Sequence, residues 1–200
     1  MGNLPYFSKT YDERVLMSSI IGTAVLREKF NNFIVHGAVA PSSSYLVGRM
    51  ISLVEQTDGL KVLQLGYGTG VFTSELLQKV GENGRIVTFE IDQACEKYAI
   101  DDSRITYVFD SAEKISLYFP TTRFDVILST LPLALMSNEV SQKILKLARA
   151  HLASNGTFLQ YQYSLYSRKD ITSIFSRDPD IFFELRNIPP AFYYRVNNAY

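Results

Sequence analysis

The sequence predicts an α/β fold with a doubly wound, mostly parallel sheet and additional helices at the N-terminal end. Short apolar runs rich in β-branched residues alternate with longer amphipathic segments from Val62 to Arg195, and turn-forming residues separate them. The first of these runs leads through a glycine-rich turn into a helix. Strands that alternate with helices imply right-handed crossovers and a sheet that is covered on both faces.

The composition indicates one globular domain. Of the 200 residues, 46% are hydrophobic, which is enough for a full core. The 20 basic side chains balance the 20 acidic ones, which argues against a general nucleic-acid binder. One cysteine and two histidines exclude a disulfide framework and a zinc cluster. We therefore expect a single domain over residues 1–200 without a bound metal, made of an N-terminal helical cap (1–57) and a core (58–200).

The N-terminal part predicts two helices and no export signal. No apolar run is long enough to span a bilayer, and the first residues lack a secretory signal, so we expect a cytoplasmic protein. The helix predicted for Tyr11–Ile34 carries three acidic and three basic side chains, so a charged membrane attracts it little. We interpret it either as a helix packed over the active-site cleft or as a peripheral contact with the inner membrane. A second helix is predicted for Ser42–Gln56, with Ser42 in its N-cap region.

The remaining elements follow in order along the chain. The helix at Asn138–Leu152 has apolar side chains every 3.6 residues, and Asn155-Gly156 predicts a left-handed stop behind it. The last two strands flank Pro189-Pro190 and are expected to be antiparallel neighbours at one sheet edge. The other predicted helices are Val71–Val80 and Asp92–Ile100, and the predicted strands are Val62–Leu65, Arg85–Glu90, Ile105–Phe109, Phe124–Ser129, Thr157–Tyr163, Phe182–Arg186 and Phe192–Val196.

The strongest local signal is the turn between the first strand and the next helix, with glycines at positions 66, 68 and 70. Glycine is used where the backbone needs positive φ or where a ligand touches the main chain. Dinucleotide-binding turns place their third glycine one residue later, at the position of Val71. The spacing therefore favours S-adenosylmethionine (SAM), which has no phosphate, and a turn with a purely structural role is the alternative.

Acidic residues follow the next two strands. Glu90 ends the second strand, about 20 residues after Gly70, where a carboxylate can accept both ribose hydroxyl hydrogens. Asp110 follows the third strand and is placed to accept from an adenine amino group, next to Ser111 and Ala112. Each carboxylate alone is also typical of a solvated strand end or a cap. Together with the turn they favour a nucleoside cofactor.

These residues resemble the class I SAM-dependent methyltransferases and, within them, the small bacterial phospholipid N-methyltransferases that act on phosphatidylethanolamine. The resemblance covers about residues 33–196. It implies a Rossmann-like, seven-stranded sheet with an antiparallel edge, SAM as cofactor, and a lipid or small-molecule amine as acceptor. Four segments carry it, of which the first two are shared with ribosomal RNA adenine methylases: Gly37–Ser43, the turn with Gly70–Thr73, Phe124–Leu133 and Arg186–Phe192.

The resemblance also implies where the acceptor lies. Ser129–Pro132 stands where amino-methylating relatives hold the acceptor nitrogen, and backbone carbonyls of such a loop can bind N–H hydrogens without competing for the lone pair. An ordinary strand-to-helix turn is the structural alternative. Leu133 replaces the aromatic residue that stacks on a base in adenine methylases, which disfavours a nucleic-acid substrate.

We assign candidate roles on this basis. The catalytic candidates are Ser129, Leu131 and Tyr161, and the substrate-binding candidates are His36, Thr130, Pro132, Tyr163 and Arg195. The cofactor-binding candidates are Ser42, Ser43, Gln64, Gly66, Tyr67, Gly68, Thr69, Gly70, Glu90, Ile91, Asp110, Ser111, Ala112 and Ser129.

Two departures from the family pattern keep other functions open. Gln64 replaces an acidic residue, which permits a non-catalytic SAM-binding regulator, and Tyr67 replaces a small residue or proline beside the cofactor. A pocket lined with tyrosines would stabilise a sulfonium cation. In such a pocket the amino group of SAM itself can attack another carbon, giving a small cyclic amino acid and methylthioadenosine.

Overall fold

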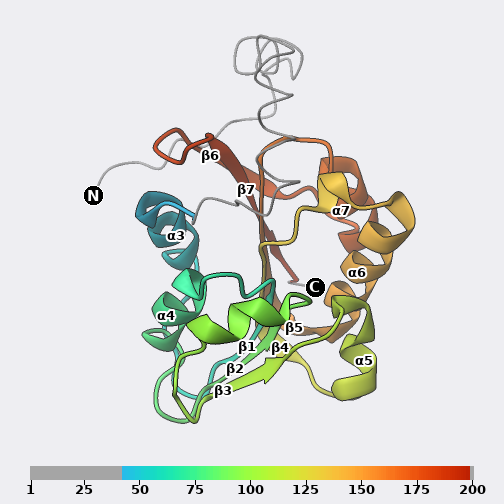
Figure 1. Ribbon diagram of the computed structural model, residues 1–200. Helices are drawn as coiled ribbons and strands as arrows, with labels where there is room; N and C mark the ends of the chain where they lie inside the picture. The colour runs from blue at the N-terminus through green and yellow to red at the C-terminus, as the bar shows by residue number, and fades with distance from the viewer. Residues whose placement is uncertain (1–41, 199–200) are drawn as a thin grey trace. The chain divides into compact units, whose positions relative to one another are not determined.

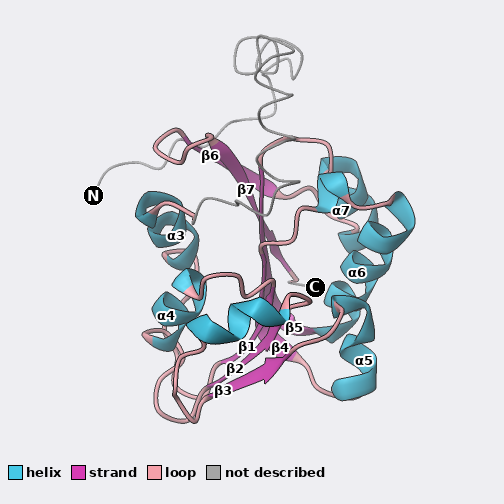
Figure 2. Cartoon of the chain, viewed as in Figure 1, coloured by secondary structure: helices cyan, strands magenta, loops and turns pink. Residues whose placement is uncertain are grey.

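The computed structural model describes residues 42–198, which lie in one compact unit that begins at Ser42. A seven-stranded sheet of order β3-β2-β1-β4-β5-β7-β6 forms its centre (Figure 2). Strands β1 to β5 are parallel, whereas β7 runs antiparallel to both β5 and β6. The structure therefore confirms the expected Rossmann-like sheet with an antiparallel edge.

All seven predicted strands are present, but β5 begins at Leu152, five residues before the predicted start at Thr157. The central strands β1 and β4 are buried over almost their whole length, as expected for parallel strands with helices on both faces. The strands are β1 Lys61–Leu65, β2 Arg85–Phe89, β3 Ile105–Val108, β4 Phe124–Ser129, β5 Leu152–Gln162, β6 Asp180–Glu184 and β7 Ala191–Asn197.

Helices cover both faces of the sheet: α3 and α4 lie on one side, and α5, α6 and α7 lie on the other (Figure 1). The sequence patterns do not predict α5 and α7, and the helix predicted after β2 is a 3₁₀ helix. The α-helices are α3 Ser44–Ile51, α4 Val71–Leu77, α5 Ile115–Tyr118, α6 Asn138–His151 and α7 Arg168–Phe175, and the 3₁₀ helices are Gln93–Tyr98, Ala112–Lys114 and Leu133–Leu135.

Helix α3 packs on the sheet. Its N-cap is Ser43, one residue after the predicted position, and the Ser43 Oγ accepts a hydrogen bond from the Leu46 amide at 3.2 Å. The apolar side chains of Leu46 and Met50 are fully buried in the same cluster as Phe72 of α4. The chain from Ser42 onward is thus part of the core unit, although the predicted cap extends to residue 57.

The predicted left-handed stop at Asn155-Gly156 is wrong. Helix α6 ends at His151, and the next residue, Leu152, is already extended and begins β5. Gly156 lies inside β5 without positive φ, beside a register shift in the pairing with β4. A Cβ at this position would lie 2.7 Å from Leu152 Cδ1, so close packing explains the glycine.

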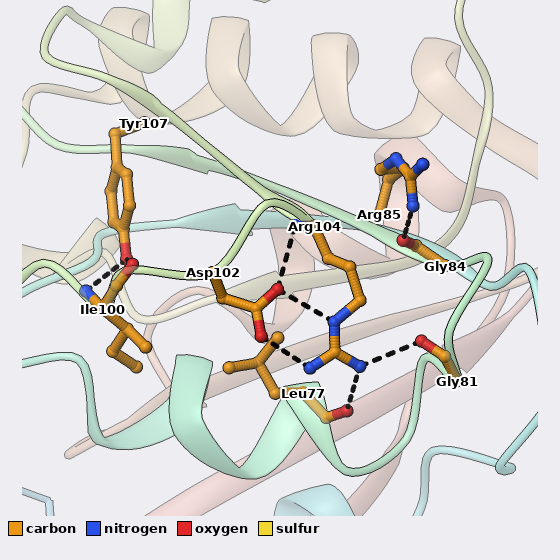
Figure 3. Close-up of polar contacts among 8 residues, drawn as sticks. All are labelled: Leu77, Gly81, Gly84, Arg85, Ile100, Asp102, Arg104 and Tyr107. Carbon is orange, nitrogen blue, oxygen red and sulfur yellow. Dashed lines mark hydrogen bonds and ion pairs between the residues drawn. The ribbon is translucent and has the colours of Figure 1, made fainter.

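Arg104, just before β3, forms hydrogen bonds to Asp102 and to the segment that follows α4 (Figure 3). Its Nε and Nη2 donate to the two carboxylate oxygens of Asp102 at 2.9 and 2.7 Å, and its Nη1 donates to the carbonyls of Leu77 and Gly81 at 3.4 and 3.0 Å. The hydrogen bond from Arg104 lowers the pKa of Asp102 to about 2. The start of β3 is thereby joined to the end of α4, which supports the strands that carry the candidate site.

Several expectations lie outside the described residues: the helix Tyr11–Ile34 with its proposed contacts, His36, and the segment 37–41 of the resemblance. A single domain over the whole chain stays a prediction. In the stretch 42–198, no helix is both long enough and apolar enough to pass through a bilayer.

Candidate active site

The candidate site lies at the carboxyl edge of the parallel strands, where ligands bind in open α/β sheets. Hydrogen bonds join the segments that follow neighbouring strands. The Gly66 amide donates to Phe89 of β2, the Glu90 amide donates to Val108 of β3, and the Thr130 amide donates to Leu65 of β1. The glycine turn, Glu90 and the loop Ser129–Pro132 are therefore neighbours, as the sequence predicts.

The glycine turn has positive φ at all three glycines: 85° at Gly66, 55° at Gly68 and 76° at Gly70. A Cβ at Gly66 would overlap Thr130 Oγ1, and one at Gly70 would lie 2.7 Å from the hydroxyl oxygen of Tyr67. A Cβ at Gly68 would meet no atom within 4 Å. The turn thus packs against the protein at its two ends and is open at its middle, beside the predicted contact Thr69, where a ligand can approach the backbone.

Gln64 braces the turn from within the protein. Its side chain is fully buried, its Nε2 donates to the Gly66 carbonyl at 3.1 Å, and its Oε1 accepts from Thr73 Oγ1 at 2.7 Å. The sequence predicts a contact between Gln64 and the cofactor, whereas the structure places both ends of the amide in bonds that hold the turn.

Tyr67 also lies beneath the turn. It is buried, its hydroxyl donates to the Tyr98 carbonyl, and its ring meets the Tyr107 ring edge-on at a centroid distance of 5.1 Å. Burial raises the pKa of Tyr67, so the hydroxyl stays protonated. The ring thus supports the turn and is not exposed at the rim of the cleft.

Glu90 lies against the open part of the turn. Its Oε2 accepts from the Gly68 amide at 3.0 Å, and its Oε1 accepts from the amides of Ile91 and Asp92 at 2.8 and 3.0 Å. These donors fix the carboxylate at the position expected for a ribose contact. Ile91, another predicted cofactor contact, is 75% exposed, so its side chain is available to a ligand.

Asp110 is held by its own neighbours after β3. Its carboxylate accepts from Lys114 Nζ at 2.9 Å, from the Tyr118 hydroxyl at 2.8 Å and from the Ser111 amide at 2.7 Å. Lys114 contributes most to lowering the pKa of Asp110 to about 2. The adjacent Ala112 is buried. Asp110 is therefore ionised and oriented at neutral pH, as an acceptor for an amino group requires.

The loop after β4 contacts the turn directly. Thr130 Oγ1 donates to the Gly66 carbonyl at 2.9 Å, and the buried Ser129 Oγ accepts from the Leu131 amide at 3.4 Å. The Leu131 carbonyl, a candidate to hold the acceptor amine, already accepts from the Leu133 amide at 2.8 Å. Pro132, at the end of the loop, is exposed.

Two glutamines of β5 bind the same carbonyl, and the sequence patterns predict a role for neither. Gln160 Nε2 and Gln162 Nε2 donate to the Leu131 oxygen at 3.0 and 2.9 Å. With the Leu133 amide this makes three donors, so the carbonyl has no lone pair left for a substrate. Polar residues at alternate positions of a buried strand are the signal that could have identified them.

The residues at the start of α3 meet β5 and the β6–β7 connection. Ser42 Oγ donates to the Tyr161 hydroxyl at 3.3 Å, and the Ser43 amide donates to Asn187 Oδ1 at 2.9 Å. Tyr163 packs edge-on against Tyr161. Burial raises the pKa of both tyrosines, so they stay neutral and act as hydrogen-bonding groups rather than as bases.

Arg195 lies away from this group. Its Nη2 donates to Asp180 at 2.8 Å within the β6–β7 pair, and it pairs with Leu159 across β5, three residues before the end of that strand. Among residues 42–198, no three His, Cys, Asp or Glu side chains are grouped to hold a metal ion.

The described residues fit SAM. The turn is open beside Gly68, the Glu90 carboxylate is fixed by backbone amides, and the Asp110 carboxylate is ionised. This arrangement is compatible with the predicted contacts to the amino-acid part, the ribose and the adenine of SAM. The space beside Gly68 is open, since a Cβ at this position would meet no atom within 4 Å, although its amide is bonded to Glu90.

Comparison with known proteins supports the same cofactor. The model of the methyltransferase domain family matches residues 62–156, which include the turn, both carboxylates and the loop after β4. Over 170 residues the chain is 25% identical to an ornithine lipid N-methyltransferase of Singulisphaera acidiphila, which covers 80% of this chain and 88% of the relative.

Solved structures share the fold. N-methyltransferase NodS from Bradyrhizobium japonicum WM9, in complex with S-adenosyl-l-homocysteine, superimposes with a TM-score of 0.61 at 13% identity, covering 94% of this chain and 93% of that one. An rRNA methylase from Streptococcus thermophilus gives a TM-score of 0.60 at 12% identity, covering 76% and 93%. The solved structures show that the fold is that of the class I methyltransferases. The methyltransferase-domain match over residues 62–156, together with the related N-methyltransferase and the site geometry, supports a SAM-dependent methyltransferase.

Proposed function

We propose that this methyltransferase transfers its methyl group to the amine nitrogen of a lipid head group. The observation that carries the proposal is the loop Ser129–Pro132, which is bonded to the cofactor turn through Thr130 and held from behind by Gln160 and Gln162. The weak similarity to an ornithine lipid N-methyltransferase supports a lipid amine as the acceptor. The family match favours methyl transfer over ring closure and over a non-catalytic regulator.

Within the loop, the Thr130 carbonyl is the group that suits an acceptor amine. Leu131 and Pro132 already accept hydrogen bonds inside the protein, whereas none of the described residues donates to the Thr130 oxygen. An oxygen that accepts one amine N–H orients the nitrogen and leaves its lone pair free. We assign Thr130 the role of substrate-positioning residue through this carbonyl.

The chemistry needs little else from the protein. SAM supplies an electrophilic methyl group on a sulfonium centre. The neutral amine nitrogen attacks that carbon, the carbon–sulfur bond breaks with its electrons passing to sulfur, and the nitrogen then loses a proton to water. The chain orients the amine through the loop, and burial keeps Tyr161 and Tyr163 neutral, so they add no negative charge.

The surface beside the site suits a lipid. Ile188 and Leu185, in the connection between β6 and β7, are 83% and 69% exposed, and Tyr45 of α3 is 52% exposed. The Arg186 guanidinium stacks over the Tyr45 ring at 4.1 Å. Arg186 is also ion-paired with Glu184, its Nε donating to Oε1 at 2.9 Å, so the exposed apolar side chains rather than its charge favour contact with acyl chains at an interface. Asn187 of this connection accepts a hydrogen bond from the Ser43 amide, which links the surface to the start of α3.

The test is product analysis with purified full-length protein and labelled SAM. S-adenosylhomocysteine formed only when dispersed phosphatidylethanolamine or ornithine lipid is present supports the proposal. Product formed equally well with short water-soluble amines would assign a small-molecule methyltransferase instead. Methylthioadenosine formed from SAM alone would indicate ring closure, and SAM binding without any product would indicate a regulator.

A further inference from the structure

A cavity lies at the edge of the sheet opposite the candidate active site. It has a volume of about 590 Å³ and is lined where β4 and β5 begin and α6 and α7 end. Phe124 and Leu152, the first residues of β4 and β5, are paired at this edge, whereas Ser129 and Gln160 are paired at the edge with the candidate active site. At about 3.3 Å per residue, β4 separates the two edges by roughly 17 Å.

Three cations line this cavity: Arg123, Lys146 and Arg149. No acidic residue lines it, and no carboxylate of the described residues forms an ion pair with any of the three. The chain as a whole has zero formal net charge, so three unpaired cations in one cavity are a local concentration of positive charge.

The cations keep hydrogen-bond donors free. Arg149 uses Nη1 for the Ile174 carbonyl and the Ser176 hydroxyl, and Arg123 uses Nη1 for the carbonyls of Thr121 and Thr122. Each guanidinium retains its Nε and Nη2 hydrogens for a ligand. Lys146 donates to no described residue, so all three of its hydrogens are available.

Helix electrostatics explain only part of this cluster. The last turn of a helix favours cations, which accounts for Arg149 but not for Lys146 one turn earlier. Arg123 lies outside every described helix, in the segment before β4, and its charge is not explained in this way. Ser173 of α7 adds a hydroxyl to the cavity, and Leu152 and Ile174 add apolar surface.

We propose that this cavity binds a small soluble phosphate ester. Its two guanidiniums and one ammonium match the oxygens of a phosphate, and its apolar wall accommodates a small organic group. A phosphate on a bilayer lipid fits the geometry less well, because a flat bilayer cannot contact both opposite edges of the sheet. The argument against a bilayer phosphate rests on the proposed lipid substrate, whereas the cavity and its charges do not.

The test is calorimetric titration of the full chain with inorganic phosphate and with glycerol 3-phosphate, in the absence of SAM and acceptor. We expect both probes to bind, and Arg123→Met and Lys146→Met each to weaken binding about tenfold or more, since charge-assisted bonds are lost. Lys169→Met is the matched control: this lysine is exposed on the neighbouring helix α7 outside the cavity, and its loss should leave affinity unchanged. Equal thermal unfolding midpoints show that the variants are folded.

Three results would overturn the proposal. In the first, the wild-type protein binds neither probe. In the second, Arg123→Met and Lys146→Met bind both probes as tightly as Lys169→Met does. In the third, the two cavity variants, but not the control, lose binding to phosphatidylcholine vesicles that contain phosphatidylglycerol. The last result would assign the cations to a bilayer. None of these measurements requires methyl transfer. The result can therefore be interpreted even if the proposed lipid methyltransferase function is wrong.

Discussion

Thr130 donates its hydroxyl to the Gly66 carbonyl at 2.9 Å and thereby joins the loop after β4 to the turn after β1, across 64 positions of the chain. A Cβ at position 66 would overlap the same hydroxyl oxygen. The two segments that are expected to hold cofactor and acceptor therefore pack as one unit. Small changes at this contact should affect stability and catalysis together.

Gly66→Ala should destabilise the fold far more than Gly68→Ala. Both substitutions place a side chain at positive φ, which costs about 1–2 kcal/mol, but only the first also overlaps a packed neighbour, which costs about 1–3 kcal/mol more. Urea unfolding measures the two free energies. Equal losses for both variants would contradict the packing at Gly66.

The second prediction concerns SAM affinity. Glu90→Gln should weaken SAM binding at least tenfold, because an amide can accept from only one ribose hydroxyl and loses the charge assistance. Calorimetric titration with SAM measures the change. Glu96→Gln, an exposed residue of the following 3₁₀ helix, is the control and should leave affinity unchanged. Unchanged affinity in Glu90→Gln would remove the assigned ribose contact.

Lys114→Met should raise the pKa of Asp110 from about 2 towards its ordinary value of 3.8. Because the folded-state pKa is lowered, the stabilisation by this carboxylate is present above about pH 4 and is lost as the pH falls towards 2. The variant should therefore lose less stability over that range than the wild type. NMR titration of the carboxyl carbon measures the pKa, and Lys143→Met, whose lysine pairs with Glu113, should leave it unchanged.

Gln160→Met and Gln162→Met should lower kcat about tenfold or more while SAM affinity stays the same. Each variant removes a donor from the Leu131 carbonyl, which lets the transfer loop shift, and a shift of about 1 Å can cost a factor of 10² in rate. Steady-state kinetics with the lipid acceptor and SAM titration separate the two effects. Gln142→Met on α6, whose amide bonds to Asp170, is the control. A matching loss of SAM affinity would indicate a general structural defect instead.

Tyr67→Phe distinguishes a support of the turn from a cofactor contact. The hydroxyl donates to the Tyr98 carbonyl beneath the turn, so its loss should reduce the free energy of unfolding by about 1 kcal/mol and change SAM affinity less than twofold. Denaturant unfolding and SAM titration provide both numbers. A tenfold loss of SAM affinity at unchanged stability would restore the predicted contact between Tyr67 and the cofactor. Tyr166→Phe, at an exposed position, should change neither quantity.

Local patterns predict the elements whose causes are local. Alternation of apolar strands with amphipathic segments locates the seven strands. The signal is strongest at β1 and β4, because a central parallel strand is buried on both faces. Helices α5 and α7 are missed, because four and eight residues show little periodicity. The stop at Asn155-Gly156 is mispredicted because an Asn-Gly pair is typical of a left-handed residue, whereas Gly156 serves close packing against Leu152.

The sequence by itself determined the seven strands along the chain, the glycine turn, the carboxylates at the ends of β2 and β3, and hence the kind of cofactor. Only the tertiary structure decided what the polar side chains do. Gln64 and Tyr67 support the glycine turn. Gln160 and Gln162 donate to the Leu131 carbonyl, whereas no described residue donates to the Thr130 carbonyl. The reason is physical. A strand or turn depends on neighbouring residues, whereas a side-chain hydrogen bond depends on which distant segment the strand register brings within about 3 Å.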